Sequence, residues 1–588
     1  FEQCGNQTAT VIALGCLKEY QFNNAVSLAA IKDVGGLETL VNLLQTENHK
    51  CIVGSLGVLG EVCHSREMQK QLTDMGAVQQ LVELLSGPHP LLQSLSAEVL
   101  FNLAKIRKAR FIVRKSGGIP ILVDLLDVKR SLLTTPKNTM DTADLQTLDV
   151  LIGSVKALWS LSQCKKNKEE MRKAGCVKLL ACLLRSVHQQ LVVYTMGIVQ
   201  QCASEKSYRM DIQSEGMLSE MVRFLSSENA QLKKHSASAL FKCAEEAKTG
   251  QLVREHGGLD PLVSIMRGCS QDGDPELLAA ATGAVWKCSF LPDNIRRLEQ
   301  LNTVQLLVQL LNDNHEEVLT NVAGALGECA KLEHNREEIV RCGGIERLVH
   351  LLTYDNPQLL ENVTKVLGEC ANNAESMAKI AQLDGVRFIW SLLKNKSNSV
   401  QSTAASALVP CIKNYKGSAE MVRSLVGGLE LLVSLLKSED KDVVRNVCLA
   451  ISHIAADRDN LAVITDHGVI PLLCNLVDTE EDGLRESVSL AMGSCCMWGD
   501  NCLELGKLGA VPPLVSYMAS SDPRVHRSTA LALYNLSSHP FNCITLHRSG
   551  VVPYLLVTIA SSDESVQQAS AGCLSNIRRL ALIADSLR

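Results

Sequence analysis

Cysteine is the residue type in this chain whose spacing most suggests chemistry. The chain has 588 residues with 22 cysteines, and seven of them recur at near-regular intervals: Cys202, Cys243, Cys288, Cys329, Cys370, Cys411 and Cys495. Equivalent atoms in neighbouring helical repeats lie about 8–10 Å apart, which exceeds the Cα separation of about 7 Å that a disulfide can span. The chain contains no Cys-x-x-Cys pair. We therefore predict small, buried core thiols in a reducing compartment.

Other motifs that could support catalysis are incomplete. The segment from Gly499 to Gly506 and Lys507 resembles a phosphate loop, but six residues separate its glycines instead of four, and Leu508 replaces the required Ser or Thr. The sequence has no His-Glu-x-x-His, no Gly-x-Ser-x-Gly and no EF-hand loop. Nothing assembles a nucleophile, a base and an oxyanion site. We therefore expect no enzymatic activity, no cofactor and no metal site.

The composition favours a folded helical protein. Hydrophobic residues make up 46% and charged residues 21%, while aromatic residues make up only 4%, which is low for a β-sandwich or barrel. A net charge of −5 gives no overall basic field for nucleic acid. The charge-free run Ser186–Ser204 contains four glutamines and is a poor membrane span. No signal peptide is recognised, and a chain that starts at Phe1 is expected to be part of a longer protein.

An internal period organises the sequence. The motif Gly-Gly-apolar-x-x-Leu-Val-x-Leu-Leu returns as GGLETLVNLL from Gly35 and GGIERLVHLL from Gly343. Nine of its twelve spacings are 41 residues, and the others are 58, 45 and 43. The first position of the motif holds Gly35, Gly76, Gly117, Gly175, Gly216, Gly257, Asn302, Gly343, Asp384, Gly427, Gly468, Gly509 and Gly550. Gly, Asn and Asp best tolerate a left-handed backbone, so a short helix is predicted to end at each of these positions.

Three helices are predicted in each period. The first should start about eight residues before the glycine column, with Asn, Ser or Thr as the N-cap, and the spacings Asn335–Glu338 and Asn167–Glu170 suggest capping boxes. The N-cap candidates are Ser27, Asn167, Thr249, Asn294, Asn335, Ser376, Asn460, Asn501 and Asn542. A second helix follows the glycine, and its apolar face includes Ile345 and Leu348. A third, longer helix ends in motifs such as ALGECA, at Ala330.

Three helices in about 41 residues is the armadillo pattern. The sequence predicts an all-α, right-handed superhelical armadillo solenoid of about thirteen three-helix repeats over residues 1–588, preceded by a partial N-terminal repeat at 1–26. Stacked repeats share one continuous core, so no separate domains are expected. The 58-residue spacing places a loop insertion at 127–143, which could equally be a binding element or tolerated surface. The 45-residue spacing places four extra residues around Gly268–Gly273.

Binding surfaces are expected on the third helices, which line the concave face of armadillo folds. One column in these helices carries the candidate partner-binding residues Glu61, Asn102, Lys242, Lys287, Glu328, Glu369, His453, Asn535 and Asn576. The stretch from Lys242 to Glu369 could bind a partner of alternating charge, or its charges could simply be solvated. Nearby glycines such as Gly283 could admit a partner or let the repeats pack closely.

A basic edge is expected where third helices meet the following first helices. It contains Lys105, Arg107, Lys108, Arg110, Arg114 and Lys115 in one repeat and Lys165, Lys166, Lys168, Arg172 and Lys173 in the next. This edge could be solvated surface, or it could bind an acidic protein surface such as tubulin or an acidic coiled coil.

Five stretches carry a more specific resemblance. They are FEQCGNQTATVIALGCLKEYQFNNAVSLAA (Phe1–Ala30), LDGVRFIWSLLKN (Leu383–Asn395), EMVRSLVGGLELLVSLLKS (Glu420–Ser438), DNLAVITDHGVIPLL (Asp459–Leu473) and AGCLSNIRRLAL (Ala571–Leu582). They resemble the armadillo-repeat subunit of the outer dynein arm docking complex of motile cilia and flagella, and the resemblance runs from end to end of the chain. That family has a further N-terminal region.

The resemblance implies a non-enzymatic scaffold that helps attach outer dynein arms to doublet microtubules, located in the cytoplasm and cytoskeleton at the ciliary axoneme. The implied partners are coiled-coil docking subunits, a tetratricopeptide-repeat subunit, an EF-hand subunit, outer-arm dynein heavy chains and tubulin, with no nucleic acid and no membrane. One alternative is a peptide-binding transport or adhesion adaptor. It would need the Asn/Trp array of importin-α, of which only Asn102, Asn535 and Asn576 are present. Another is the substrate-binding part of a U-box ubiquitin ligase.

Overall fold

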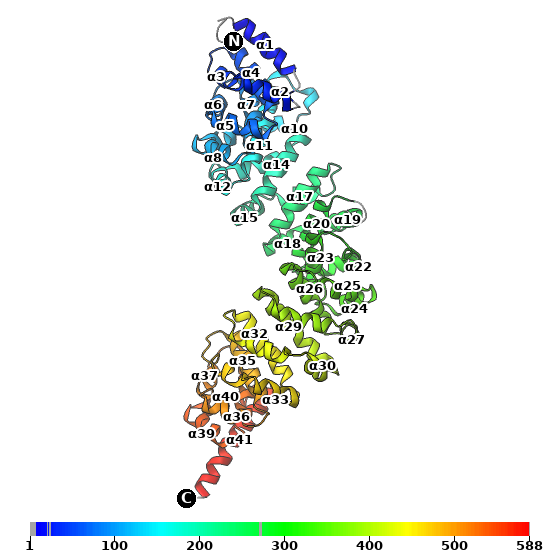
Figure 1. Cartoon of the computed structure of the whole chain (residues 1–588), viewed down its shortest axis with the longest axis vertical. Helices are drawn as coiled ribbons and strands as arrows, with labels where there is room; N and C mark the ends of the chain where they lie inside the picture. The colour runs from blue at the N-terminus through cyan, green and yellow to red at the C-terminus, as the bar shows by residue number, and fades with distance from the viewer. Residues whose placement is uncertain (1–6, 20–21, 23–24, 270–272, 587–588) are drawn as a thin grey trace. The chain divides into compact units, whose positions relative to one another are not determined.

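The computed structural model describes residues 7–19, 22, 25–269 and 273–586, and in these residues it contains helices and no strand (Figure 1). The all-α prediction is confirmed. The chain forms two compact units, Phe1–Arg297 and Leu298–Arg588, and Figure 1 shows the helices of each unit stacked in chain order. The single continuous solenoid expected from the sequence stays a prediction.

Unit Phe1–Arg297 begins with an isolated third helix and continues with complete repeats. Its first helices are α2 (Ala25–Asp33), α5 (Arg66–Asp74), α8 (Arg107–Lys115), α12 (Lys165–Lys173), α15 (Lys206–Ser214), α18 (Ala247–Glu255) and most of α21 (Pro292–Gln300), which continues past Arg297. Its second helices are α3 (Gly36–Leu43), α6 (Ala77–Leu85), α9 (Gly118–Asp124), α13 (Cys176–Leu183), α16 (Leu218–Phe224) and α19 (Leu259–Cys269). Its third helices are α1 (Gln7–Glu19), α4 (His49–Val62), α7 (Pro90–Leu103), α11 (Thr142–Leu161), α14 (Gln189–Cys202), α17 (Ala230–Cys243) and α20 (Pro275–Cys288).

Unit Leu298–Arg588 repeats the same order. Its second helices are α22 (Thr303–Leu310), α25 (Gly344–Leu351), α28 (Gly385–Ser391), α31 (Gly428–Ser434), α34 (Val469–Cys474), α37 (Val511–Tyr517) and α40 (Val551–Thr558). Its third helices are α23 (Glu316–Cys329), α26 (Pro357–Cys370), α29 (Asn398–Asn414), α32 (Lys441–Ile454), α35 (Asp482–Cys495), α38 (Pro523–Leu536) and α41 (Glu564–Ser586). Its first helices are α24 (Glu333–Arg341), α27 (Ala374–Gln382), α30 (Ser418–Ser424), α33 (Arg458–Asp466), α36 (Asn501–Lys507) and α39 (Pro540–Arg548).

The left-handed column is confirmed at all thirteen positions. Their φ angles run from 52° at Asn302 to 84° at Gly76. Asn302 and Asp384 are the non-glycine residues with positive φ among the described residues, as expected for the two types that tolerate this conformation best. The period in the sequence therefore records a backbone requirement at the corner between first and second helices.

The predicted start of the first helix is wrong by three residues in α12 and α24. In α24 the N-cap is Leu332 and in α12 it is Cys164, so Asn335 and Asn167 lie inside the first turn and are buried. The capping-box prediction is also wrong. Glu338 forms an ion pair with Arg341 instead of reaching back to the helix start.

These buried asparagines join helices instead of capping one. Asn294 Nδ2 donates to the carbonyl of Cys288, at 2.9 Å, and to that of Gly250, at 3.0 Å. Cys288 is the last residue of α20, where a carbonyl has no partner within the helix, and Gly250 lies in the first helix of the preceding repeat. Asn542 binds Leu536 and Cys502 in the same way. One amide group therefore ties together three helices at each of these two corners.

Packing follows the period within each unit. Each second helix packs on the third helix of its own repeat, and each third helix packs on the third helix of the next. The predicted apolar face of α25 is confirmed, because Ile345, Leu348, Val349, Leu351 and Leu352 are buried. All seven cysteines of the predicted column are buried as well. Burial raises the pKa of the Cys243, Cys288 and Cys370 thiols to about 12, so they behave as apolar core side chains.

The insertion at 127–143 is a folded element. It contains α10 (Arg130–Thr134) and the 3-10 helix η1 (Lys137–Thr139), and Leu132 and Leu133 are buried. The carbonyl of Leu133 accepts the Val187 N–H at 2.9 Å, and His188 Nε2 lies 2.9 Å from the Leu132 carbonyl. The insertion is thus attached to the loop before α14.

The other irregular spacings appear as local changes. Helix α19 extends to Cys269, and residues 270–272 of the predicted Gly268–Gly273 insertion lie outside the described residues. Two further 3-10 helices, η2 (Leu392–Lys394) and η3 (Leu435–Lys437), continue α28 and α31. No helix of the described residues is long and apolar enough to cross a membrane.

Candidate partner-binding surfaces

In unit Phe1–Arg297, the predicted partner-binding column of the third helices contains exposed, half-buried and buried side chains. Glu61 is exposed. Asn102 is buried and accepts a hydrogen bond from Lys105 Nζ at 3.0 Å. Lys242 is half-buried and donates to the Gln200 carbonyl at 2.9 Å. Burial lowers the pKa of Lys242, and the positive charge of Lys168 lowers this pKa further.

An aromatic row that we did not predict lies beside this column. Trp159 on α11 stacks on Phe101 of α7, with ring centroids 6.4 Å apart, and contacts Tyr194 of α14 at 5.5 Å and His235 of α17 at 5.6 Å. On α20, Lys287 Nζ lies 4.3 Å from the centroid of the Trp286 ring. Phe101 and Trp286 directly precede the column residues Asn102 and Lys287, and Trp159 precedes Ser160, which holds the same position in its repeat. The three aromatic residues hold one position of the repeat, so their spacing is visible in the sequence.

The glycines near the column make room for these aromatic rings. A Cβ atom on Gly197 would lie 2.8 Å from Trp159 Nε1, and one on Gly283 would lie 2.9 Å from Phe241 Cδ2. The sequence left open whether such glycines admit a partner or let the repeats pack closely. At these two positions the structure supports close packing of the repeats. They are occupied from within the chain and offer no approach to a partner.

Two glutamates of the column differ sharply in unit Leu298–Arg588. Glu328 is 1% exposed, and its carboxylate binds Lys331 Nζ at 2.5 Å and Lys365 Nζ at 2.6 Å. Glu369, one repeat later, is half-buried and forms no ion pair with any described residue. Glu328 is therefore neutralised inside the protein, whereas Glu369 can meet a partner. The predicted run of alternating charge from Lys242 to Glu369 extends over both units and stays a prediction.

A groove crosses α26, α29 and α32 beside Glu369. Its cavity measures about 350 Å³, and Glu369, Lys413 and His453 lie in its lining. Pro410, also in the lining, lies inside α29 and removes one backbone donor there. Burial lowers the pKa of His453, and the positive charge of Lys413 lowers this pKa further. The imidazole is therefore neutral near neutral pH. The groove thus combines a carboxylate, a lysine and a neutral histidine.

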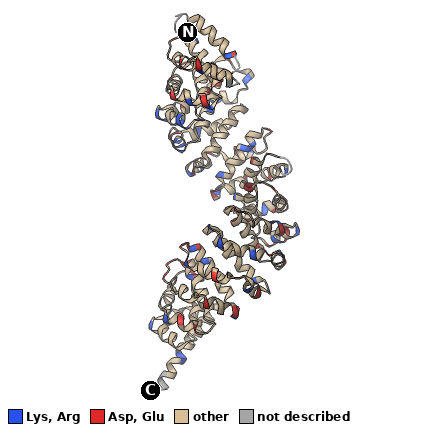
Figure 2. Cartoon of the chain, viewed as in Figure 1, with Lys and Arg blue, Asp and Glu red and all other residues tan. Residues whose placement is uncertain are grey.

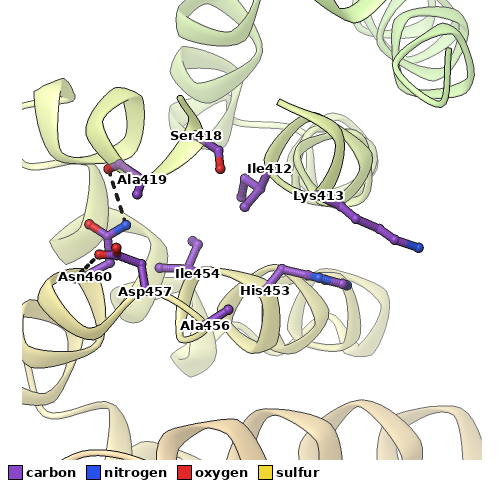
Figure 3. Close-up of a pocket in the computed structure, with 9 residues that line it drawn as sticks. All are labelled: Ile412, Lys413, Ser418, Ala419, His453, Ile454, Ala456, Asp457 and Asn460. Carbon is purple, nitrogen blue, oxygen red and sulfur yellow. Dashed lines mark hydrogen bonds between the residues drawn. The ribbon is translucent and has the colours of Figure 1, made fainter. Parts of the chain in front are cut away.

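A second cavity of about 380 Å³ adjoins this groove (Figure 3). Lys413 and His453 line both cavities. The first helix at this position, α30, has seven residues, and Ala419 stands eight residues before Gly427, where six other repeats have a buried Asn. Figure 3 shows Asn460 of the following repeat donating to the Ala419 carbonyl, at 3.3 Å. A small side chain at this corner therefore leaves a space that a partner side chain could occupy.

The last two column residues hold helices together. Asn535 Nδ2 donates to the Gly493 carbonyl at 2.8 Å, and Asn576 Nδ2 donates to Ser537 Oγ at 2.9 Å. Both side chains remain half-buried, and their amide donors are already engaged.

The basic edge forms on neighbouring helices α8 and α12, where Figure 2 shows basic residues gathered. Several of its cations have acidic partners. Lys108 binds Asp74 at 2.5 Å, Arg172 binds Asp211 at 2.6 Å, and Lys165 and Lys168 approach Glu205. Arg110 binds the carbonyls of Ala104 and Lys105. Arg107, Lys115 and Lys166 form no ion pair with any described residue, and they are exposed.

The described residues contain no group of three or more His, Cys, Asp or Glu side chains that could hold a metal ion. The surfaces found here are suited to binding other macromolecules through charge and shape.

Comparison with known proteins identifies the family. The armadillo/beta-catenin-like repeat family matches residues 292–331, 333–371, 426–456, 500–538 and 543–579. A structure solved in a study of the interaction between cadherin and β-catenin has a TM-score of 0.57 and 17% sequence identity, and the match covers 85% of this chain and 98% of that one, which supports the fold alone.

Two curated relatives are much closer in sequence. Outer dynein arm-docking complex subunit 2 of Bos taurus is 48% identical over 79% of this chain and 44% of its own length. Armadillo repeat-containing protein gudu of Drosophila melanogaster is 47% identical over 80% of this chain and 70% of its own length. The chain spans less than half of the bovine protein and more than two thirds of the fly protein. It belongs to the armadillo-repeat family that includes gudu and outer dynein arm-docking complex subunit 2.

Proposed function

We propose that this chain is the armadillo part of a non-enzymatic scaffold that anchors outer dynein arms to the doublet microtubules of the ciliary axoneme. The observation that carries the proposal is the 48% identity with a relative named as a docking-complex subunit. We further propose that the armadillo repeats form one continuous solenoid, since long stacked arrays offer extended surfaces for several partners. The proposed location is the axoneme, within the cytoplasm and cytoskeleton.

The groove across α26, α29 and α32 is the proposed docking surface for one of the partners. It presents an unpaired carboxylate at Glu369 next to Lys413 and His453. Charged groups at a partly open surface contribute mainly to orientation and specificity, while the adjoining cavity can hold an anchoring side chain. Coiled-coil, tetratricopeptide-repeat and EF-hand docking subunits, dynein heavy chains and tubulin are the partners that we propose for the complete protein.

The test is a gene disruption in cells with motile cilia, followed by electron microscopy of axoneme cross-sections. The proposal expects outer dynein arms to be lost and the unaltered gene to restore them. A Glu369→Arg variant should restore fewer arms than the matched Glu375→Arg variant, because Glu375 is exposed on α27 and does not line the groove. Axonemes with a full set of outer arms after gene disruption would refute the docking role and favour an adaptor or a ligase instead.

A further inference from the structure

Three faces of helix α8 contact the rest of the protein. Ala109 and Val113 are buried in the core. Lys108 points toward the preceding repeat, where its Nζ lies 2.5 Å from Asp74 Oδ1. Arg110 and Arg114 point toward the junction with the following repeat, where Arg110 binds Gln163 Oε1 at 3.1 Å and Arg114 binds Asn167 Oδ1 at 3.2 Å.

The remaining face of α8 has no such use. Arg107, Phe111 and Lys115 are spaced four residues apart and therefore lie in one row along the helix. All three are exposed, and Phe111, a large aromatic residue, has 52% of its surface in solvent. Arg107 and Lys115 form no ion pair with any described residue. The face thus presents an aromatic ring with an unpaired cation one helical turn to each side.

The surroundings of this row are strongly basic. Residues 101–185 contain 17 Lys and Arg against 7 Asp and Glu, an excess of ten positive charges in a chain whose net charge is −5. Arg114 keeps its guanidinium 5.4 Å from the centroid of the Phe111 ring, which adds positive charge close to the aromatic surface. An approaching acidic partner would therefore be attracted before it makes contact.

We propose that the row Arg107–Phe111–Lys115 docks a helix of another protein, one that carries an apolar side chain with an acidic residue one turn before and one turn after it. Successive turns of a partner helix rise about 6 Å per four residues, which matches the spacing of the row. The proposal names the chemistry of one partner within the docking role proposed above, on a surface separate from the groove.

A nucleic acid fits this surface less well. A duplex carries one charge per about 1.7 Å of its axis and would require a denser set of cations. Asp74, Glu169 and Glu170 lie among the basic residues of α5 and α12 and would repel a continuous phosphate backbone. The exposed Phe111 ring would also find no matching group on a phosphate backbone.

The test measures binding of the purified chain to a synthetic helical peptide of Ala and Gln that carries Glu-x-x-x-Leu-x-x-x-Glu rows. Fluorescence anisotropy at low salt should show binding that weakens as salt is added. Phe111→Ala should weaken it about tenfold, and Arg107→Glu with Lys115→Glu should also weaken it by at least tenfold. The matched control reverses Lys394 and Lys437, which are exposed on η2 and η3, and should leave binding unchanged.

Three outcomes overturn the proposal: no binding of the peptide, binding that Phe111→Ala leaves unchanged, or equal binding of a scrambled peptide, polyglutamate or duplex DNA. Circular dichroism should show unchanged melting for the Phe111 variant, because this side chain is outside the core. Failure of this test leaves the arm-loss experiment on axonemes unaffected, so the two proposals can fail separately.

Discussion

Gly283 on α20 lies directly against the aromatic ring of Phe241 on α17, so close that a Cβ atom on Gly283 would be 2.9 Å from Phe241 Cδ2. Gly197 and Trp159 show the same relationship between α14 and α11. An aromatic residue next to the partner-binding column thus covers a glycine in the next repeat. The effect on stability of substituting either residue should therefore depend on the identity of the other.

Gly283→Ala should destabilise the protein by about 1–3 kcal/mol, because the added methyl group overpacks the contact with Phe241. In a Phe241→Ala background the same change should be neutral or stabilising, since Ala favours a helix over Gly by about 1 kcal/mol. A double-mutant cycle of urea melts measures this coupling. Equal effects of Gly283→Ala in both backgrounds would show that the ring does not determine the need for glycine.

Asn294→Ala should cost about 1–3 kcal/mol, because the buried carbonyls of Cys288 and Gly250 lose their donor. The effect should be local, so hydrogen exchange should rise at the junction of α20 and α21 more than elsewhere. Asn138→Ala, in the exposed η1 segment, is the control and should change neither exchange nor melting. A uniform rise in exchange along the chain would contradict this joining role.

Glu328→Gln should lower stability by about 1–3 kcal/mol, because it removes the charge that binds Lys331 and Lys365 at a buried site. Glu369→Gln should leave stability nearly unchanged, because this carboxylate has no ionic partner among the described residues. Thermal melts of the two variants separate a structural role from a docking role within one sequence column. Equal losses of stability in both variants would remove the distinction.

Acidification should weaken the region around His453. Burial and Lys413 lower the pKa of His453 in the folded chain, so the unfolded chain binds more protons as pH falls below about 6.5. The stability that the neutral imidazole provides is therefore present above the unfolded pKa and is lost as pH falls through the folded pKa. Exchange of amides in α32 should increase on acidification, and His453→Gln should reduce that increase. An unchanged pH dependence in the variant would exclude this histidine as its source.

The period and the helix order could be predicted because they depend on local backbone chemistry. Asn302 and Asp384 fit the glycine column because Asn and Asp tolerate a left-handed backbone, which is a property of the single residue. The start of the first helix could not be placed as well, because Asn294 acts through carbonyls in two other helices, one of them 44 residues away in sequence. In α12 and α24 the buried Asn lies only three positions after the N-cap.

The sequence could locate the partner-binding column, but it could not tell which of its side chains are neutralised inside the protein and which can meet a partner. Glu328 and Glu369 occupy the same position in successive repeats, yet only Glu328 is neutralised by a lysine from the next third helix. The residue that corresponds to Lys365 in the following repeat is Ser406, which cannot form that ion pair. This difference was present in the sequence, and it becomes meaningful once the contact between Glu328 and Lys365 is known.

The docking role is tested most directly by cross-linking mass spectrometry on isolated axonemes that contain the full-length protein. The account predicts cross-links from exposed lysines, including Lys166 and Lys413, to docking-complex, outer-arm dynein and tubulin subunits. Cross-links confined to soluble cytosolic or nuclear proteins would contradict it.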